Sequence, residues 1–259
     1  MRLRDWIAAL TCCVALHAAG AQEPFASEEA LGQWVTYYYT RPQPARVAEA
    51  IASASRMGLF REGRAAPPFF GFLAGVLGKE PAIADAVVHR LVQLPEADQP
   101  VVILGVWYSG HRDTGRLLAG LKKAMPAQKK PIETLLQGEA PRLTAVSLEE
   151  GPWVLDALWG NFMATGDDAP VIRIITALPW VDVRGDTAKM MVGGAAQWSL
   201  ASNAVQHARV LAICRAQLRN QPKEVAAALT KVIAQAEEDL AKRKTEGTTQ
   251  SPSRPAGAR

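Results

Sequence analysis

The sequence predicts an all-α protein built from packed antiparallel helical hairpins, and three observations lead to this prediction. Apolar residues recur at spacings of three and four over most of the 259 residues, which is the period of a helix buried on one face. Ala and Leu are abundant, whereas runs of β-branched residues are few and short. Pro and Gly stand between the periodic segments, where they end one helix and open the next.

Residues 1–21 are predicted to be a cleaved signal peptide. Two arginines precede an apolar stretch that is short for a membrane span, and small residues at Ala19–Ala21 suit a signal peptidase that cleaves before Gln22. A retained N-terminal anchor is the alternative. The residues before Cys12 and Cys13 do not form a lipoprotein box, and no later segment is apolar enough to span a membrane.

We expect a single helical domain over residues 22–244 and a disordered basic tail over 245–259. The tail combines Ser, Thr, Pro and Gly with cations and has no apolar period. The whole chain carries 29 basic and 25 acidic residues. This small excess predicts no specific nucleic-acid binding, although the tail can make weak contacts with an anionic surface.

Local signals place the helices of the first half. Ser27 is a predicted N-cap with acidic residues after it, Pro44 and Pro81 suit first helical positions, and Gly58 suits a helix end. The predicted helices cover 28–40, 45–58, 67–78, 81–94, 95–110 and 111–125.

The second half begins with a long connection over 126–146 that holds one short helix. Ser147 and Glu150 have the spacing of a capping box for a helix over 148–166, and Asp168 is a predicted cap for the next. A long helix follows over 187–220, in which Gly193-Gly194 marks a kink or a close contact, and then an amphipathic helix over 221–244. The total is about ten helices. The strand-like runs 101–104 and 171–175 are interpreted as buried helix faces.

Two segments resemble each other at an offset of 89 positions. Phe70 matches Trp159, Gly71 matches Gly160, Gly75 matches Ala164 and Pro81 matches Pro170, and at an offset of 91 Trp107 matches Trp198. Gly71 and Gly160 are predicted where two helices approach closely. The match indicates a helical hairpin used twice, as in an α-solenoid, or a chance similarity.

Three stretches together carry a resemblance. These are the tyrosines 37–39 followed by Pro42 and Pro44, "FFGFLAGVLGKEP", and "LWGNFMATGDDAPVIRII". The pattern resembles exported all-helical bacterial proteins that have no assigned activity. The resemblance covers most of the mature chain and implies a helical fold, and it brings no catalytic residues with it.

The histidines and cysteines predict no metal or cofactor site. His89 and His207 fall on predicted helices, His111 falls in a loop, and none has zinc-ligand spacing to another candidate ligand. Cys214, the single cysteine after the signal, is predicted to be a buried apolar residue. Ser109, His111 and Asp113 are the residue types of a hydrolytic triad, but three residues around one turn do not align for that chemistry, and no G-x-S-x-G elbow is present.

Aromatic residues supply the candidate binding surface. Consecutive helical residues point about 100° apart, so at least one of Tyr37, Tyr38 and Tyr39 is expected to face water or a partner. Trp107 and Tyr108 stand beside His111 and Arg112, form a second amphipathic patch and suit interface anchors. The predicted binding residues are Tyr37, Tyr38, Trp107, Tyr108, His111 and Arg112. Core packing is the alternative for each aromatic residue.

These observations favour an exported, non-catalytic binding or scaffolding protein of the bacterial cell envelope, periplasmic or secreted. Its expected partner is a protein or a peptide. Two alternatives remain open at this point: a hydrolase-type enzyme with a site near His111, and a periplasmic immunity or effector-binding module.

Overall fold

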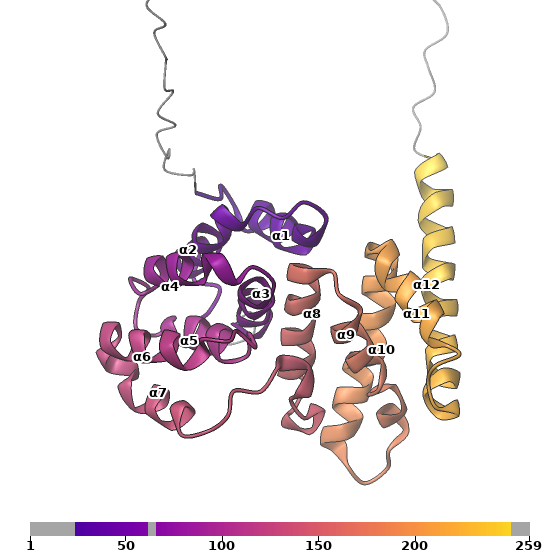
Figure 1. The fold of residues 1–259 in the computed structure, drawn as a ribbon. Coiled ribbons are helices and arrows are strands. Elements are labelled where there is room, and N and C mark those ends of the chain that lie inside the picture. Colours follow the sequence, from indigo (N-terminus) through magenta and orange to yellow (C-terminus); the bar gives the residue numbers. More distant parts are fainter. Residues whose placement is uncertain (1–23, 62–65, 250–259) are drawn as a thin grey trace, which may run out of the picture.

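The computed structural model describes residues 24–61 and 66–249, and it confirms the all-α prediction (Figure 1). In these two ranges the chain forms twelve α-helices, several 3-10 turns and no strand. None of the described helices combines the length and apolar character that a membrane crossing requires. The predicted signal peptide lies outside the described residues, as do residues 250–259 of the predicted tail.

Seven helices form the first half of the fold, and three prolines create similar joints between them. Pro44, Pro81 and Pro126 each open a 3-10 turn that leads directly into an α-helix. Proline suits this position because its φ is already helical and it lacks the N–H that would remain unpaired. The helices are α1 (Glu28–Thr36), α2 (Val47–Arg56), α3 (Ala66–Lys79), α4 (Ala84–Leu91), α5 (Gln99–Trp107), α6 (Thr114–Ala124) and α7 (Lys129–Leu136).

Five helices form the second half. They are α8 (Trp153–Thr165), α9 (Asp168–Ile175), α10 (Thr187–Gln206), α11 (Ala208–Gln217) and α12 (Lys223–Thr249). The C-terminal part of α12 extends past its neighbours (Figure 1), and the helix includes residues 245–249 of the predicted tail. The two strand-like runs lie in α5 and α9, as predicted.

The capping-box prediction at Ser147 is wrong. The Ser147 hydroxyl accepts a hydrogen bond from the Glu149 amide, and the result is one 3-10 turn, Leu148–Glu150, rather than an α-helix. Gly151 then takes a φ of 116°, and α8 begins after Pro152. A glycine with this backbone conformation separates the turn from the helix.

Two further boundaries differ from the prediction. Asp167, not Asp168, occupies the N-cap position of α9. The predicted helix over 187–220 is divided into α10 and α11 by His207, whose backbone is extended at φ −123° and ψ 106°. Gly193 is a place of close packing, since a Cβ there would meet the Trp180–Val181 backbone, whereas a Cβ at Gly194 would meet nothing.

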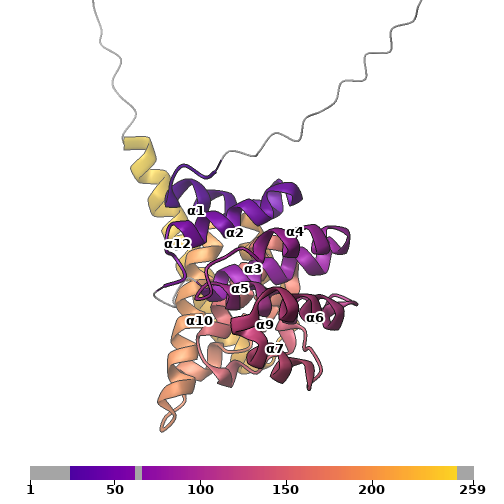
Figure 2. The ribbon, with the colours of Figure 1, turned by 90° about the vertical axis from the view of Figure 1, so that its left-hand side faces the viewer.

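Helices α3 and α8 pack closely against each other in the middle of the molecule (Figure 1), and α3 is also central in the view of Figure 2. They run in the same direction, since Phe70 contacts Trp153 near their N-termini and Lys79 contacts Thr165 near their C-termini. A Cβ at Gly71 would overlap the main chain of Ala157, and a Cβ at Gly160 would overlap that of Pro68. The predicted close approach at both glycines is therefore confirmed.

The internal similarity does not extend to the third helix of each segment. Trp107 on α5 is 8 % exposed, whereas Trp198 on α10 is 73 % exposed. Helix α5 packs on α3, but α10 packs mainly on α12 and on the 3-10 turn Leu178–Asp182. The two tryptophans therefore have different environments, and the structural correspondence is limited to the α3 and α8 segments and the turns that follow them.

Candidate functional site

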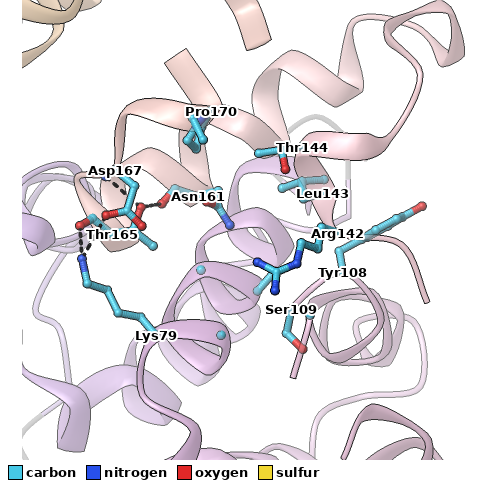
Figure 3. A pocket seen from close by; sticks show the side chains of 15 residues that line it. Lys79, Tyr108, Ser109, Arg142, Leu143, Thr144, Asn161, Thr165, Asp167 and Pro170 are labelled. Atoms are coloured by element: carbon cyan, nitrogen blue, oxygen red, sulfur yellow. Dashed lines mark hydrogen bonds and ion pairs between the residues drawn. The ribbon is translucent and has the colours of Figure 1, made fainter. Parts of the chain in front are cut away.

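A cleft of about 260 Å³ opens where α3 and α8 end, and we name it the α3–α8 cleft. Four segments line it: the end of α3, the turn after α5, the turn Leu143–Ala145 with the residue before it, and the end of α8 with the start of α9. Figure 3 shows the polar side chains that reach it. They are Lys79, Tyr108, Ser109, Arg142, Thr144, Asn161, Thr165 and Asp167.

Arg142 carries the uncompensated charge of this cleft. Among the described residues its guanidinium has neither an acidic partner nor a hydrogen bond, and it points with the Asn161 amide toward the middle of the cleft (Figure 3). The Arg142 stem lies over Gly110, where an added Cβ would approach the Arg142 Cγ to 3.3 Å. Gly110 has a φ of 64°, so the turn needs glycine both for its backbone and for this space.

Lys79 is already paired on the opposite side of the cleft. Its ammonium donates to the Thr165 carbonyl at 2.6 Å and to the Asp167 carboxylate at 3.2 Å. The Thr165 hydroxyl donates to the Asn161 carbonyl and accepts from the Asp167 amide. These bonds fix the turn between α8 and α9 and neutralise the lysine, which leaves Arg142 as the group available to an anion.

Tyr108 forms the aromatic edge of the cleft. Its ring stacks on Phe70 with centroids 5.9 Å apart and contacts Trp153. Burial, together with the charge of Glu150, raises the pKa of the Tyr108 hydroxyl. The ring therefore provides an apolar wall and a neutral hydroxyl beside the guanidinium.

Ser109, His111 and Asp113 do not make the contacts of a hydrolytic triad. The Ser109 hydroxyl donates to the Val106 carbonyl at 2.7 Å and accepts from the His111 amide. The His111 Nδ1 atom accepts from the Asp113 amide at 3.0 Å, and its Nε2 atom lies 3.4 Å from the Pro81 carbonyl. His111 is 8 % exposed and does not line the cleft. These bonds hold the turn that precedes α6.

The six predicted binding residues lie in two separate places. Tyr37 is exposed against the His207 ring, and Tyr38 is 3 % exposed against Phe72, where burial raises its pKa to about 12. The others follow one another through the end of α5 and the next turn: Trp107 is buried, Tyr108 lines the cleft, His111 is buried and Arg112 is exposed beside Asp113.

The sequence reading missed the residues that make the cleft. Arg142 lies in a connection without an apolar period, and Asn161 lies in the middle of an apolar helix. One signal was present, because the polar turns after the two matched helices, at Lys79 and at Asp167, meet on one side of the cleft. No cluster of three or more possible metal ligands occurs in the part of the chain that the structure describes.

Comparison with protein-family models, with curated proteins and with solved structures found no match.

Proposed function

We propose that this protein is an exported, non-catalytic binding or scaffolding protein of the bacterial cell envelope, and that its α3–α8 cleft receives an acidic group of a protein or peptide partner. The guanidinium of Arg142 is the observation that supports this most, since it is uncompensated, exposed and directed into a defined cleft. A guanidinium presents a planar set of donors that matches a carboxylate in a bidentate geometry.

The size and lining of the cleft favour a segment of a chain over a whole protein surface. About 260 Å³ has room for one or two side chains or a chain end. The Tyr108 ring and Pro170 offer apolar contact, while Thr144 and Asn161 offer hydrogen bonds. A small acidic segment can therefore be anchored by Arg142 and oriented by the polar residues around it.

Binding is favoured over hydrolysis because the groups that catalysis needs are engaged elsewhere. The Ser109 hydroxyl and the His111 ring are both bonded to main-chain atoms, with no bond between them in the described structure. A nucleophile has to lie within hydrogen-bond reach of its base. The proposed export derives from the signal-like residues 1–21.

The test is site-specific crosslinking from inside the cleft. A photo-crosslinking amino acid at Thr144, in the mature chain from Gln22, is activated in the envelope fraction, and the attached peptide is identified by mass spectrometry. We expect a segment with an acidic side chain or a free C-terminus. A hydrogen bond to a charged group contributes about 1.5–3 kcal/mol to binding. The Arg142→Ala variant loses this contribution, so its capture of the partner should be about 10–100-fold weaker.

Arg219→Ala is the matched control, because Arg219 is exposed on the surface and does not line the cleft. Tyr38→Ala and Trp107→Ala are poor probes, since both side chains are buried and their loss perturbs the core. Capture that is equally strong in the Arg142→Ala and Arg219→Ala variants contradicts the proposed role of the cleft.

A further inference from the structure

Helix α10 exposes the largest apolar side chains of the described surface. Trp198 is 73 % exposed, Met191 is 60 % exposed and Met190 is 45 % exposed. Smaller residues lie one and two turns from Trp198 on the same face of the helix. We call this surface the α10 stripe, and it consists of Met191, Gly194, Trp198, Ala201, Ser202 and Val205.

The α10 stripe has no free charge. Lys189 is the single ionisable residue from Thr187 to Gln206, and its ammonium pairs with Glu149 at 2.7 Å. The solvent face of a surface helix is normally charged and polar. A helix face that lacks charge and exposes Trp and Met has instead the composition of an interface core.

The stripe is complementary to itself in one orientation. About a two-fold axis that crosses the stripe at the level of Ala196, antiparallel packing places Trp198 beside the partner's Gly194 and Met191 at the level of the partner's Ala201. Each bulky side chain then faces a small one, and the same contacts recur on the other side of the axis. A Cβ at Gly194 would meet nothing within 4 Å, so this position has open space for a side chain of the partner.

We propose that the α10 stripe is the contact surface of a homodimer in which the two α10 helices pack antiparallel. Parallel packing is unfavourable in comparison, because it places Trp198 against the partner's Trp198 and leaves the open space at Gly194 unfilled. Since the face is uncharged, a second copy adds no like-charge repulsion across the helix pair. The proposal is independent of the α3–α8 cleft.

The area of contact predicts a weak and reversible dimer. A helix of 20 residues is about 30 Å long and about 10 Å wide, so two stripes cover roughly 600 Å² in total. Stable specific interfaces cover about 1,200–2,000 Å². We therefore expect a dissociation constant between about 10 μM and about 1 mM.

Sedimentation velocity of the mature chain from Gln22, over a range of concentrations up to the millimolar, tests the dimer. The wild type is expected to shift from monomer to dimer as its concentration rises. Trp198→Ala and Gly194→Leu are expected to remain monomeric. Gly115→Leu is the matched control for the second variant, since a Cβ at Gly115 also meets nothing, and it should dimerise as the wild type does.

A mixing experiment tests the antiparallel register. Met191→Glu and Ala201→Lys each place two uncompensated charges in the homodimer and should be monomeric alone. Mixed together they should form a heterodimer, because the glutamate of one chain then faces the lysine of the other. A wild type that stays monomeric at millimolar concentration, or a Trp198→Ala variant that still dimerises, overturns the dimer, and a mixture that stays monomeric overturns the register.

Discussion

The α3–α8 contact leads to a quantitative prediction for Gly160→Ala. A Cβ at Gly160 would lie 2.8 Å from the Phe72 nitrogen and 2.8 Å from the Pro68 carbonyl carbon, and it would overlap the Pro68 oxygen. Carbon atoms in contact normally stand about 3.5–4.0 Å apart. All three neighbours belong to the main chain, so the clash cannot be relieved by a side-chain rotation, and the helices have to separate by about 1 Å.

The expected size follows from two opposing terms. Overpacking of a tight contact costs about 1–3 kcal/mol, and a clash with main-chain atoms belongs at the upper end. Alanine in place of glycine favours a helix by up to about 1 kcal/mol. The net loss is therefore about 2 kcal/mol, which lowers the melting temperature of a domain of this size by about 4–8 °C.

Gly120→Ala is the control that isolates the contact. Gly120 lies within α6, and an added Cβ would meet nothing within 4 Å, so alanine there should stabilise the chain by about 0.5–1 kcal/mol. Thermal and urea unfolding followed by far-UV circular dichroism measures both variants. If Gly160→Ala melts at or above the wild-type temperature, the reasoning about the close contact is refuted.

Three other predictions come from named side chains. Burial lowers the pKa of His207, whose ring packs among Tyr37, Tyr39 and Phe162, so the unfolded chain takes up the proton first as pH falls. The contribution of His207 to the free energy of unfolding is therefore complete above pH 6.5, the pKa of histidine in the unfolded chain. Below that pH the free energy of unfolding decreases by up to about 1.4 kcal/mol per pH unit. The urea midpoint should therefore change less with pH in the His207→Gln variant. Burial raises the pKa of Cys214 to about 12, so a thiol reagent at pH 8 should label it only after unfolding, and rapid labelling of the folded chain contradicts its burial. Ser27→Ala removes the cap that accepts from the Ala30 amide, which should cost about 1 kcal/mol and speed hydrogen exchange in α1, while Ser27→Asp should preserve protection.

The sequence predicted the all-α class and the positions of most helices because the signals involved are local. Ser27, Pro44, Pro81 and Gly58 act through their own backbone geometry and their nearest neighbours, so their roles follow from a few adjacent residues. The contact at Gly71 also followed from the sequence, since a glycine inside an apolar helix usually has a packing reason.

The errors occur where distant residues decide the structure. His207 interrupts a continuous helical pattern, and its ring packs on Tyr39 and Phe162, which are remote in the sequence. Trp107 and Trp198 stand at nearly the same distance after the two matched segments, but only the first is covered by other helices. The cleft combines residues of four segments, and no single spacing in the chain reports that Arg142 meets Asn161.

The central position of α3 affects how the chain can fold during translation. Every residue from Phe69 to Leu77 is buried, and α8, which covers one side of this helix, begins at Trp153. A ribosome adds about 5–20 residues each second, so the matched segment 89 positions later emerges about 5–20 s after α3. During that interval the nascent chain exposes a continuous apolar segment. The first seven helices therefore cannot complete their core until α8 has been synthesised.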